Sequence, residues 1–432
     1  MILFDGKTYE SSEQGRLLEE LSVKIPEILS GKTLDPEIVI DAVVHLRQDL
    51  LDGKFNDLLA DLPEDVVSTY KKQAVSLMSE EQLHAKIRTE LGDTEEYITD
   101  PVDGFSQIRV RKVPLGVIFH ISAGNMDFLP AYSVVEGLLT GNINILKLPS
   151  ADNGLTIKLL LQLIEYRKEL TDYIFVFDTS SSDIQGMRKM AGLCHGISVW
   201  GSDTAIEAVR NLAPTGAKII EWGQKLGFCY ITNAELVPDF DKEIDTLAHH
   251  IATTKQLLCS SCQVIYIDTE DMNEVRSFGE RFLPLLEKAA NENATNEIGI
   301  VARDTLVAYT RRLMGYLEQE EQDSDNVLRG RGVSVIIASD SRLELSPMMC
   351  NVLVKPLPRK DLGKVLFEHR HHLQTAGLIC PDDDRESLSR LFTNLGIVRV
   401  TKAGDMSAYF PGESHDGDYA LSRYVRTVNI EE

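Results

Sequence analysis

Cys259 is the residue of this sequence best placed to do chemistry. It lies within Gln256–Gln263, between a stretch with helical periodicity and an apolar strand predicted over Val264–Asp268. Its small hydroxyl neighbours, Ser260 and Ser261, would let a substrate carbonyl reach the sulfur. A thiolate is a strong nucleophile, and its fraction rises near a helix N-terminus or a cation. Cys259 is therefore a candidate nucleophile for acyl transfer, although a free cysteine is more often buried and inert.

A second cysteine follows closely, so that Cys259 and Cys262 form a C-x-x-C pair. Such pairs are typical of thiol redox sites and of half of a structural zinc site. The sequence has no second pair at zinc-finger spacing, so we expect no metal. The six cysteines are scattered through 432 residues, which suits a reducing compartment better than a disulfide framework.

Lys147 ends a predicted buried strand within the segment Gly141–Ser150. Open parallel sheets bind ligands at the carboxyl ends of their strands. A lysine at this position can reach ribose hydroxyls or a phosphate. The same pattern also fits a surface lysine that happens to end a strand, and the segment alone does not separate the two interpretations.

The segment Val199–Ile206 has the pattern of a strand, a turn of small residues and a helix start. Gly201 permits close approach of the backbone, and the amides of Ser202 and Asp203 would point at an anion together with the helix dipole. An ordinary helix N-cap fits these residues as well. The G-x-G-x-x-G fingerprint of dinucleotide-binding folds does not occur in the sequence.

Two further polar residues are candidates for catalysis. Asn125 closes the first strand of the predicted sheet and can direct a side-chain N–H at a developing oxyanion, although turn chemistry explains it more simply. Glu221 lies in the apolar, glycine-rich segment Ile220–Gly227 and can serve as a general base, or it is a plain surface glutamate.

The elements that must position these residues follow an α/β pattern. Residues from about 10 to 95 have helical periodicity, and strands then alternate with helices, which is typical of βαβ units and buried parallel sheets. The expected strands are 115–121, 143–148, 173–177, 196–200, 263–268, 333–338, 351–355, 374–380 and 397–401. The expected helices are 131–140, 153–167, 182–192, 203–212, 272–290, 303–319, 360–370 and 384–394.

Two segments predict a separate small sheet. Tyr97–Thr99 and Ser106–Val113 flank Asp103-Gly104, which is the pattern of a β-hairpin. The tail Tyr424–Ile430 alternates between apolar and polar residues as a strand does. Strand edges in such an extension favour pairing with another subunit, so we expect a homodimer or homotetramer.

In their order and spacing these segments resemble the motifs of the aldehyde dehydrogenase superfamily, and more closely its acyl-CoA reductase (LuxC-like) family. The resemblance covers nearly all of the chain after about residue 90. Its residues are Asn125, Gly141–Ser150, Trp200–Ala205, Glu221–Gln224, Cys259–Ser261, Glu344–Met348 and His415–Arg426. The helical N-terminal part is less diagnostic.

The resemblance implies a role for each candidate. Cys259 would take the acyl group as a thioester, while Asn125 and the Cys259 amide would form the oxyanion hole. Glu221 matches the base of hydrolytic aldehyde dehydrogenases. The residues implied in cofactor binding are Ser122, Lys147 (adenosine ribose), Ser150, Gly201 and Ser202 (pyrophosphate), and Glu344 (nicotinamide ribose).

Departures from the family pattern bear on the cofactor. Ser150 stands where NAD-preferring relatives often have a glutamate, three residues after Lys147. Without that carboxylate a 2′-phosphate is not repelled, which favours NADPH, with NADH as the alternative because Asp152 is close by. Ile206 replaces a second glycine of many relatives, so the pyrophosphate is expected to lie differently.

We therefore expect two doubly wound α/β domains with an aldehyde dehydrogenase-like fold plus a small oligomerisation extension. The cofactor domain would comprise 1–103 and 114–232, the catalytic domain 233–408, and the extension 104–113 and 409–432. The predicted activity is NADPH-dependent reduction of a fatty acyl thioester, as acyl-CoA or acyl-protein, to the aldehyde through a covalent cysteine thioester.

Three alternatives stay open. One is an aldehyde-oxidising dehydrogenase of the same fold, with Glu221 activating water. Another is a reductase of acyl phosphates, such as the γ-glutamyl phosphate type. The third is a non-enzymatic partner protein or a thiol-redox protein that uses Cys259 and Cys262.

The bulk composition limits the partners. The formal net charge of −23 argues against nucleic acid and against anionic membrane surfaces. No signal peptide and no apolar run of membrane length is apparent, so we expect a cytoplasmic protein. Its substrate would be an acyl thioester, delivered by CoA, a carrier protein or an acyl-transferring partner.

Overall fold

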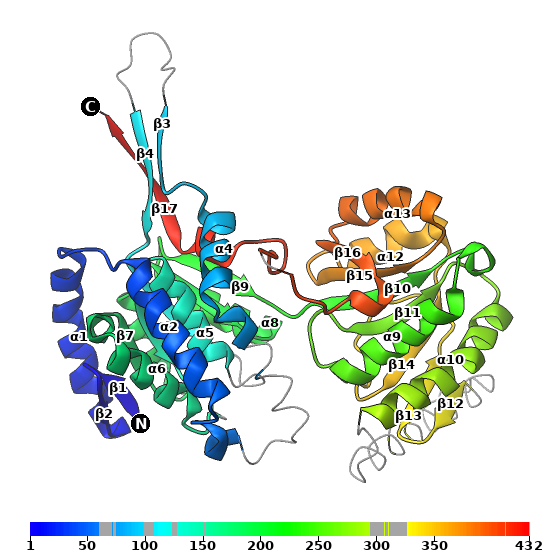
Figure 1. Cartoon of the computed structure of the whole chain (residues 1–432), viewed down its shortest axis with the longest axis horizontal. Helices are drawn as coiled ribbons and strands as arrows, with labels where there is room; N and C mark the ends of the chain where they lie inside the picture. The colour runs from blue at the N-terminus through cyan, green and yellow to red at the C-terminus, as the bar shows by residue number, and fades with distance from the viewer. Residues whose placement is uncertain are drawn as a thin grey trace. The chain divides into compact units, whose positions relative to one another are not determined.

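The computed structural model describes residues 1–59, 71, 75–98, 108–122, 128–150, 152–293, 306, 310, 326–410 and 412–431. The chain forms two compact units, shown in Figure 1. The first unit comprises Met1–Gly223 and Phe410–Glu432, and the second comprises Gln224–Tyr409. No helix within the described ranges has both the length and the hydrophobicity that crossing a bilayer demands.

The first unit is built on a seven-stranded sheet with the order β2-β1-β7-β6-β5-β8-β9. The strands are β1 (Ile2–Phe4), β2 (Lys7–Tyr9), β5 (Val117–Ile121), β6 (Ile143–Lys147), β7 (Ile174–Phe177), β8 (Gly196–Trp200) and β9 (Lys218–Trp222). From β7 to β9 all neighbours are parallel. Taken in chain order, these strands run 3-2-1-4-5, so the winding reverses between β5 and β8, where doubly wound sheets bind their ligands.

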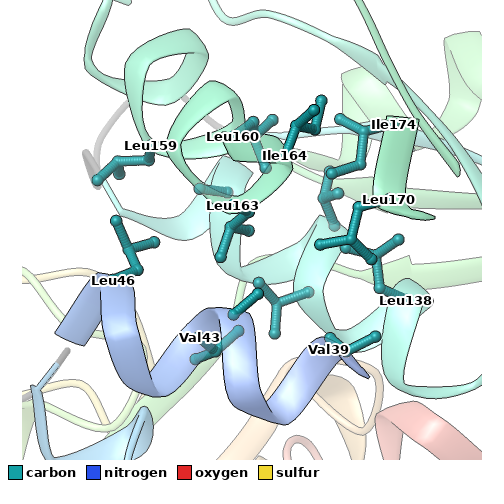
Figure 2. Packing of buried hydrophobic residues seen from close by; sticks show 14 of the residues in the cluster. Val39, Val43, Leu46, Leu138, Leu159, Leu160, Leu163, Ile164, Leu170 and Ile174 are labelled. Carbon is teal, nitrogen blue, oxygen red and sulfur yellow. The ribbon is translucent and has the colours of Figure 1, made fainter. Parts of the chain in front are cut away.

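Helices cover both faces of this sheet. On one face lie α2 (Pro36–Leu51), α4 (Glu80–Leu91), α5 (Leu129–Leu139) and α6 (Leu155–Tyr166), and on the other lie α1 (Gln14–Leu29), α7 (Ile184–Gly192) and α8 (Asp203–Leu212). In Figure 2, Val39, Val43 and Leu46 of α2 point toward the leucines of α6. Because both faces are covered, the central strands are buried nearly throughout and consist mostly of apolar residues.

The strand pair at the N-terminus was not expected from the sequence. β1 and β2 pair antiparallel through a tight turn, in which Asp5 and Gly6 both have positive φ, at 49° and 68°. β1 also pairs antiparallel with β7 and so extends the edge of the sheet. An Asp-Gly turn between short apolar runs is a known hairpin pattern, but strands of three residues give almost no periodicity.

The second unit has its own seven-stranded sheet, with the order β12-β13-β14-β11-β10-β15-β16. The strands are β10 (Leu226–Ile231), β11 (Cys262–Ile267), β12 (Val327–Gly330), β13 (Val333–Ile337), β14 (Asn351–Pro356), β15 (Leu373–Ile379) and β16 (Arg399–Lys402). Only β12 is antiparallel to its neighbour. The helices α9 (Phe240–Thr254) and α10 (Met272–Glu292) cover one face, and α12 (Leu362–Glu368) and α13 (Asp382–Asn394) cover the other.

Two differences from expectation concern this unit. We placed residues up to 232 in the cofactor domain, but β10 is hydrogen-bonded between β11 and β15 and so lies at the centre of the second sheet. The expected helix at 303–319 falls almost entirely outside the described residues.

A third sheet, with the order β17-β4-β3, extends from the first unit (Figure 1). Its strands are β3 (Glu95–Ile98), β4 (Ile108–Pro114) and β17 (Val425–Glu431), all antiparallel, so the expected hairpin and C-terminal strand are confirmed. The Asp103-Gly104 turn lies outside the described residues. Tyr424 anchors β17, because its carbonyl accepts hydrogen bonds from the Leu115 N–H and the Asn142 side chain.

Candidate active site

Four of the predicted cofactor-binding residues meet at one edge of the first sheet. Ser122 follows β5, Lys147 ends β6, and Gly201 and Ser202 follow β8. These strands are adjacent and parallel, with Ile121 in register with both Lys147 and Val199. Their carboxyl ends therefore lie side by side at the point where the winding of the sheet reverses.

Lys147 is a buried amine held by a hydroxyl. Lys147 is only 4% exposed, and its Nζ donates a hydrogen bond to the Ser181 Oγ at 2.9 Å. Burial lowers the pKa of this amine. Lys147 forms no ion pair with any carboxylate among the described residues, so two N–H donors stay available for a polar or anionic ligand. This corrects the surface-lysine interpretation.

The two serines at this edge, Ser122 and Ser202, differ in their hydrogen bonding. Ser122 is buried, and its Oγ has no hydrogen-bond partner among the described residues. Ser202 is the N-cap of α8, where its side chain accepts a hydrogen bond from the Ala205 N–H at 3.4 Å. The remaining amides of the first turn of α8 thus stay directed at the edge of the sheet, which suits an anion.

The residues expected to contact the 2′-position of a nucleotide, Ser150 and Asp152, lie just beyond β6. Ser150 is exposed, as a ligand-binding hydroxyl should be. Asp152 has both carboxylate oxygens engaged at the start of α6. They accept hydrogen bonds from the Gly154 N–H, at 2.8 Å, and from the Thr156 hydroxyl. Asp152 therefore stabilises the start of α6. Its carboxylate oxygens are already engaged, unlike those expected of the glutamate that many NAD-preferring relatives have at position 150.

Glu221 has a different environment from the apolar one expected. It lies on β9, and its two carboxylate oxygens accept hydrogen bonds from the Nε and Nη2 of Arg210 at 2.5 and 2.7 Å. The hydrogen bond to Glu221 raises the pKa of Arg210. The pair links Arg210 on α8 to Glu221 on β9.

In the second unit, Cys259 is exposed on the turn that joins α9 to β11. Lys255 and Gln256 both adopt positive φ, 49° and 60°, which ends the helix sharply. The turn is closed by hydrogen bonds between Leu258 and Ser261, at 3.0 and 3.1 Å. The thiol is therefore presented on a fixed backbone.

The first residues of β10 also support the Cys259 turn. A Cβ placed on Gly227 would lie 2.7 Å from the Ser261 carbonyl oxygen and 3.0 Å from that of Ser260. Only glycine allows this approach. A side-chain hydrogen bond also holds the turn, because the Ser260 Oγ lies 2.7 Å from the Ser407 Oγ.

Cys262, the second thiol of the C-x-x-C pair, is not placed for redox chemistry. It begins β11, is fully buried, and packs in the core with Cys229 and Ile265. Burial raises its pKa to about 12. A thiol that stays protonated and lacks access to solvent is a poor partner for disulfide exchange.

Glu344 is held by two cations in the second unit. Its Oε1 accepts a hydrogen bond from the fully buried Lys355 at 2.6 Å, and its Oε2 lies 3.1 Å from the Arg342 Nη2. The following Ser346 donates two hydrogen bonds to the Gln263 Oε1, at 3.2 and 2.8 Å, which fixes this segment to β11.

The structure thus groups the candidates by unit. Ser122, Lys147, Ser150, Gly201, Ser202 and Glu221 belong to the first unit, and Cys259 and Glu344 belong to the second. Asn125 lies outside the described residues. Sequence reasoning missed the side chains that hold the candidates in place: Ser181, Arg210, Arg342 and Lys355. Of these, only Ser181 had a visible pattern, because a serine-rich turn after an apolar strand is typical of a ligand-binding edge.

The fold is that of the aldehyde dehydrogenases. Aldehyde dehydrogenase 21 from Physcomitrella patens superposes with a TM-score of 0.67 at 14% identity, over 98% of this chain and 90% of that protein. The NADP complex of glyceraldehyde-3-phosphate dehydrogenase GapN from Methanocaldococcus jannaschii gives a TM-score of 0.69 at 13% identity, over 99% and 96% of the two chains. The predicted fold class is confirmed.

The chain belongs to the acyl-CoA reductase (LuxC) family, whose sequence pattern matches residues 33–427. The long-chain acyl-protein thioester reductase of Vibrio harveyi is 24% identical over 362 residues, which are 83% of this chain and 72% of that protein. The corresponding reductase of Photobacterium phosphoreum is 26% identical over 372 residues, 82% and 70% of the two chains. Family and fold together make the protein an oxidoreductase.

Proposed function

We propose that this protein reduces a long-chain fatty acyl thioester to the aldehyde with NADPH, through a thioester on Cys259. The observation that carries the proposal is the contrast between two neighbouring thiols. Cys259 is exposed on a rigid turn, and Cys262 is buried with a raised pKa. A single accessible thiol is what nucleophilic acyl transfer requires, whereas disulfide chemistry requires two.

The first step transfers the acyl group to the protein. The Cys259 thiolate attacks the thioester carbonyl carbon, a bond forms between sulfur and carbon, and the donor thiolate leaves and takes a proton from solvent. The Cys259 amide and Asn125 are the proposed donors to the oxyanion, and the loss of one such donor typically raises the barrier by about 2.7–4 kcal/mol. Release of the aldehyde returns the sulfur of Cys259 to the thiolate.

NADPH, when bound, supplies the hydride for the acyl carbonyl carbon. The residues of the first unit fit such a cofactor, because Ser122 offers an orphaned hydroxyl and Lys147 an amine with free donors at the switch point of the sheet. The first turn of α8, capped by Ser202, would receive the pyrophosphate. Glu344 would receive the nicotinamide ribose, as its position in the family motif implies.

The preference for NADPH rests on charge at the end of β6. Ser150 adds no negative charge there, and Asp152 has both its oxygens committed to α6. Lys147, held by Ser181, is a nearby cation without a carboxylate partner among the described residues. A 2′-phosphate would therefore gain a partner rather than meet repulsion.

Glu221 supports reduction over hydrolysis. Both of its oxygens accept hydrogen bonds from Arg210, so the carboxylate is not free to take a proton from water. In the reductive direction no water has to be activated. We propose that Glu221 acts as a base only when this pair is broken, and that the acyl-enzyme is thereby spared hydrolysis.

The acyl donor and assembly follow from the family. The relatives are named long-chain acyl-protein thioester reductases, and we propose that this chain likewise accepts a long acyl group from a partner protein, with acyl-CoA as a substitute. We also propose that it works in the cytoplasm as a homodimer or homotetramer through the β17-β4-β3 extension.

Product analysis tests the proposal directly. The full chain, incubated with long-chain acyl-CoA and NADPH, should oxidise one NADPH for each aldehyde released. Replacing Ser150 by Glu should raise KM for NADPH by about tenfold or more while leaving KM for NADH nearly unchanged, because two negative charges are then juxtaposed. Faster oxidation of aldehydes with NAD(P)+ than reduction of acyl-CoA, or free acid as the main product, would contradict the proposal.

A further inference from the structure

His415 belongs to the C-terminal motif His415–Arg426, for which the proposed reaction supplies no role. Its ring lies on the only two tryptophans of the chain, Trp200 and Trp222. All three residues belong to the first unit. The motif therefore reaches back to the sheet that carries the candidate cofactor residues.

His415 is presented by a tight hairpin. The backbones of His415 and Asp418 exchange two hydrogen bonds of 2.9 Å. Between them, Asp416 and Gly417 have φ values of 52° and 81°, the geometry of a two-residue turn that favours Asp-Gly. The short turn fixes the direction in which the imidazole leaves the backbone.

Two residues that follow fasten this hairpin to the sheet. Arg423 forms an ion pair with Asp418 at 2.6 Å and lies over the Trp222 ring, 5.7 Å from its centroid. Tyr424 is fully buried, and its hydroxyl lies 3.0 Å from the Ser198 Oγ on β8. The position of His415 is thus set by contacts on both β8 and β9.

The rings form a compact stack at the carboxyl ends of β8 and β9. The Trp200 and Trp222 rings are stacked, with centroids 5.2 Å apart and planes at 25°. The His415 ring lies 5.0 Å from Trp200 and 5.2 Å from Trp222. Both indole N–H groups are buried without a hydrogen-bond partner among the described residues. A buried donor without a partner costs free energy, so the arrangement of these rings calls for an explanation beyond packing.

The place of the stack suggests what it serves. Trp200 immediately precedes Gly201, the proposed pyrophosphate turn, and Trp222 immediately follows Glu221. Beyond the pyrophosphate, the next planar group of a dinucleotide is the nicotinamide. Trp222 is only 3% exposed, whereas Trp200 is half-buried, so the Trp200 indole is the surface of the stack that can form a wall for that ring.

We propose that His415 is a positioning residue, which orients the stacked indoles so that the Trp200 ring, backed by Trp222, forms a wall against which the nicotinamide ring rests. This inference rests on the proposed function. His415 itself does not touch the cofactor, and it acts by holding the two indoles at a fixed angle. Loss of its ring would let the indoles turn and would leave the nicotinamide less well aligned for hydride transfer.

The two tryptophans give a direct optical readout, because all indole emission of the chain comes from this stack. The probes are NADP+, which carries the nicotinamide, and 2′,5′-ADP, which carries only the adenosine half. In the wild-type protein we expect NADP+ to quench the emission and to produce a charge-transfer absorption with indole. We expect 2′,5′-ADP to bind and displace NADP+ but to leave the emission nearly unchanged.

His415→Ala removes the ring, His415→Phe keeps an aromatic ring, and His45→Ala is the matched control. His45 is also a partly exposed histidine of the first unit in ring contact, 5.0 Å from Tyr166, but it lies on α2. In His415→Ala we expect kcat to fall by about tenfold and the quench by NADP+ to fall by at least about half, because alignment is lost. Affinity for 2′,5′-ADP should stay within about twofold, since the residues proposed to hold the adenosine half, Lys147 and Ser150, are untouched. His415→Phe should restore most of the quench, and His45→Ala should behave as wild type.

The outcomes distinguish failure of the inference about His415 from failure of the proposed function. Quenching by 2′,5′-ADP equal to that by NADP+ in the wild-type protein would overturn the inference without any variant. So would identical quench and kcat in His415→Ala and His45→Ala. If the wild-type protein binds neither NADP+ nor NADPH, the proposed function itself fails and this inference falls with it.

Discussion

Each unit contains a buried histidine that is held neutral. His120, on β5, hydrogen-bonds to the Ser133 hydroxyl at 2.7 Å and to the Asn144 side chain at 2.9 Å, and burial lowers its pKa to about 4. His250, on α9, accepts a hydrogen bond from the Cys262 N–H at 3.3 Å, and burial lowers its pKa to about 4 as well. Burial therefore disfavours the charged form of both rings in the folded protein.

The depressed pKa of His120 makes the first unit sensitive to acid. An unfolded histidine titrates near 6.5, so below that pH the unfolded state binds a proton that the folded state does not. Stability should be greatest above about pH 6.5 and fall toward about pH 4, and His120 alone should account for about 2 kcal/mol between pH 7.5 and pH 5. Urea unfolding followed by tryptophan emission, which reports the first unit, measures this. His120→Gln should lose that share of the pH dependence, and an unchanged dependence would contradict the assignment.

At the scale of residues, the sequence predicted the positions of candidate groups better than their surroundings. Lys147 ends β6 and Ser202 follows β8 as expected, because the ends of apolar strands can be recognised from composition, while their roles in cofactor binding stay a prediction. The ion pair between Glu221 and Arg210 was not predicted, because it depends on how a helix and a strand are arranged in space. The different environments of Cys259 and Cys262 were not predicted either. Cys259 precedes β11 and is exposed, whereas Cys262 is the first residue of β11 and is buried.

At the scale of elements, one glycine sets the approach of a helix to the first sheet. Gly137 lies in α5, and a Cβ at this position would stand 1.8 Å from the Asn144 Oδ1 and 3.2 Å from the His120 Nε2. The helix therefore lies against β5 and β6 at a distance that only glycine allows. The same contact holds the polar pair of His120 and Asn144 in place.

Gly137→Ala should destabilise the first unit although alanine favours helices. Overpacking a well-packed contact costs about 1–3 kcal/mol, which exceeds the gain of up to about 1 kcal/mol in helix propensity. Gly15→Ala in α1 is the matched control, because nothing lies within 4 Å of a Cβ there. The control should not destabilise the unit, and it should gain up to about 1 kcal/mol from helix propensity. Equal effects of the two substitutions in urea titrations would show that the close approach is not real.

Long, buried elements were predicted well and short ones were not. The strands β5, β6 and β8 are five residues long and mostly apolar, and the helices between them have clear periodicity, so the doubly wound pattern could be recognised. The pair β1 and β2 has strands of three residues and was missed. β10 was assigned to the wrong side of the domain boundary, because hydrogen bonding to β11 and β15 leaves no mark on its own sequence.

At the scale of the whole molecule, the three-stranded extension is the proposed surface of assembly. β17 and β3 form its edges, and edge strands leave backbone groups unpaired and open to another chain. Val428 and Ile430 on β17 are only half-buried within the chain, whereas Thr427 and Asn429 of the same strand are exposed. Apolar residues at a strand edge are suited to burial between subunits.

We expect the wild-type protein to be a homodimer or homotetramer at micromolar concentration. The double variant Val428→Lys/Ile430→Lys should dissociate into monomers, because like charges would be buried at the edge. The matched control Thr427→Lys/Asn429→Lys changes the opposite face of the strand and should assemble normally. Light scattering after gel filtration measures the mass. A monomeric wild-type protein, or assembly retained in both variants, would refute the proposed role of β17.

The most direct test is the intact mass of the protein after incubation with long-chain acyl-CoA in the absence of reduced cofactor. We expect each chain to gain one acyl group, which proteolysis should locate on Cys259, and addition of NADPH should remove it with release of the aldehyde. Cys262→Ala should still be acylated, and Cys259→Ala should not. An acyl group on any other residue, or reduction of acyl-CoA by Cys259→Ala at the wild-type rate, would contradict the mechanism.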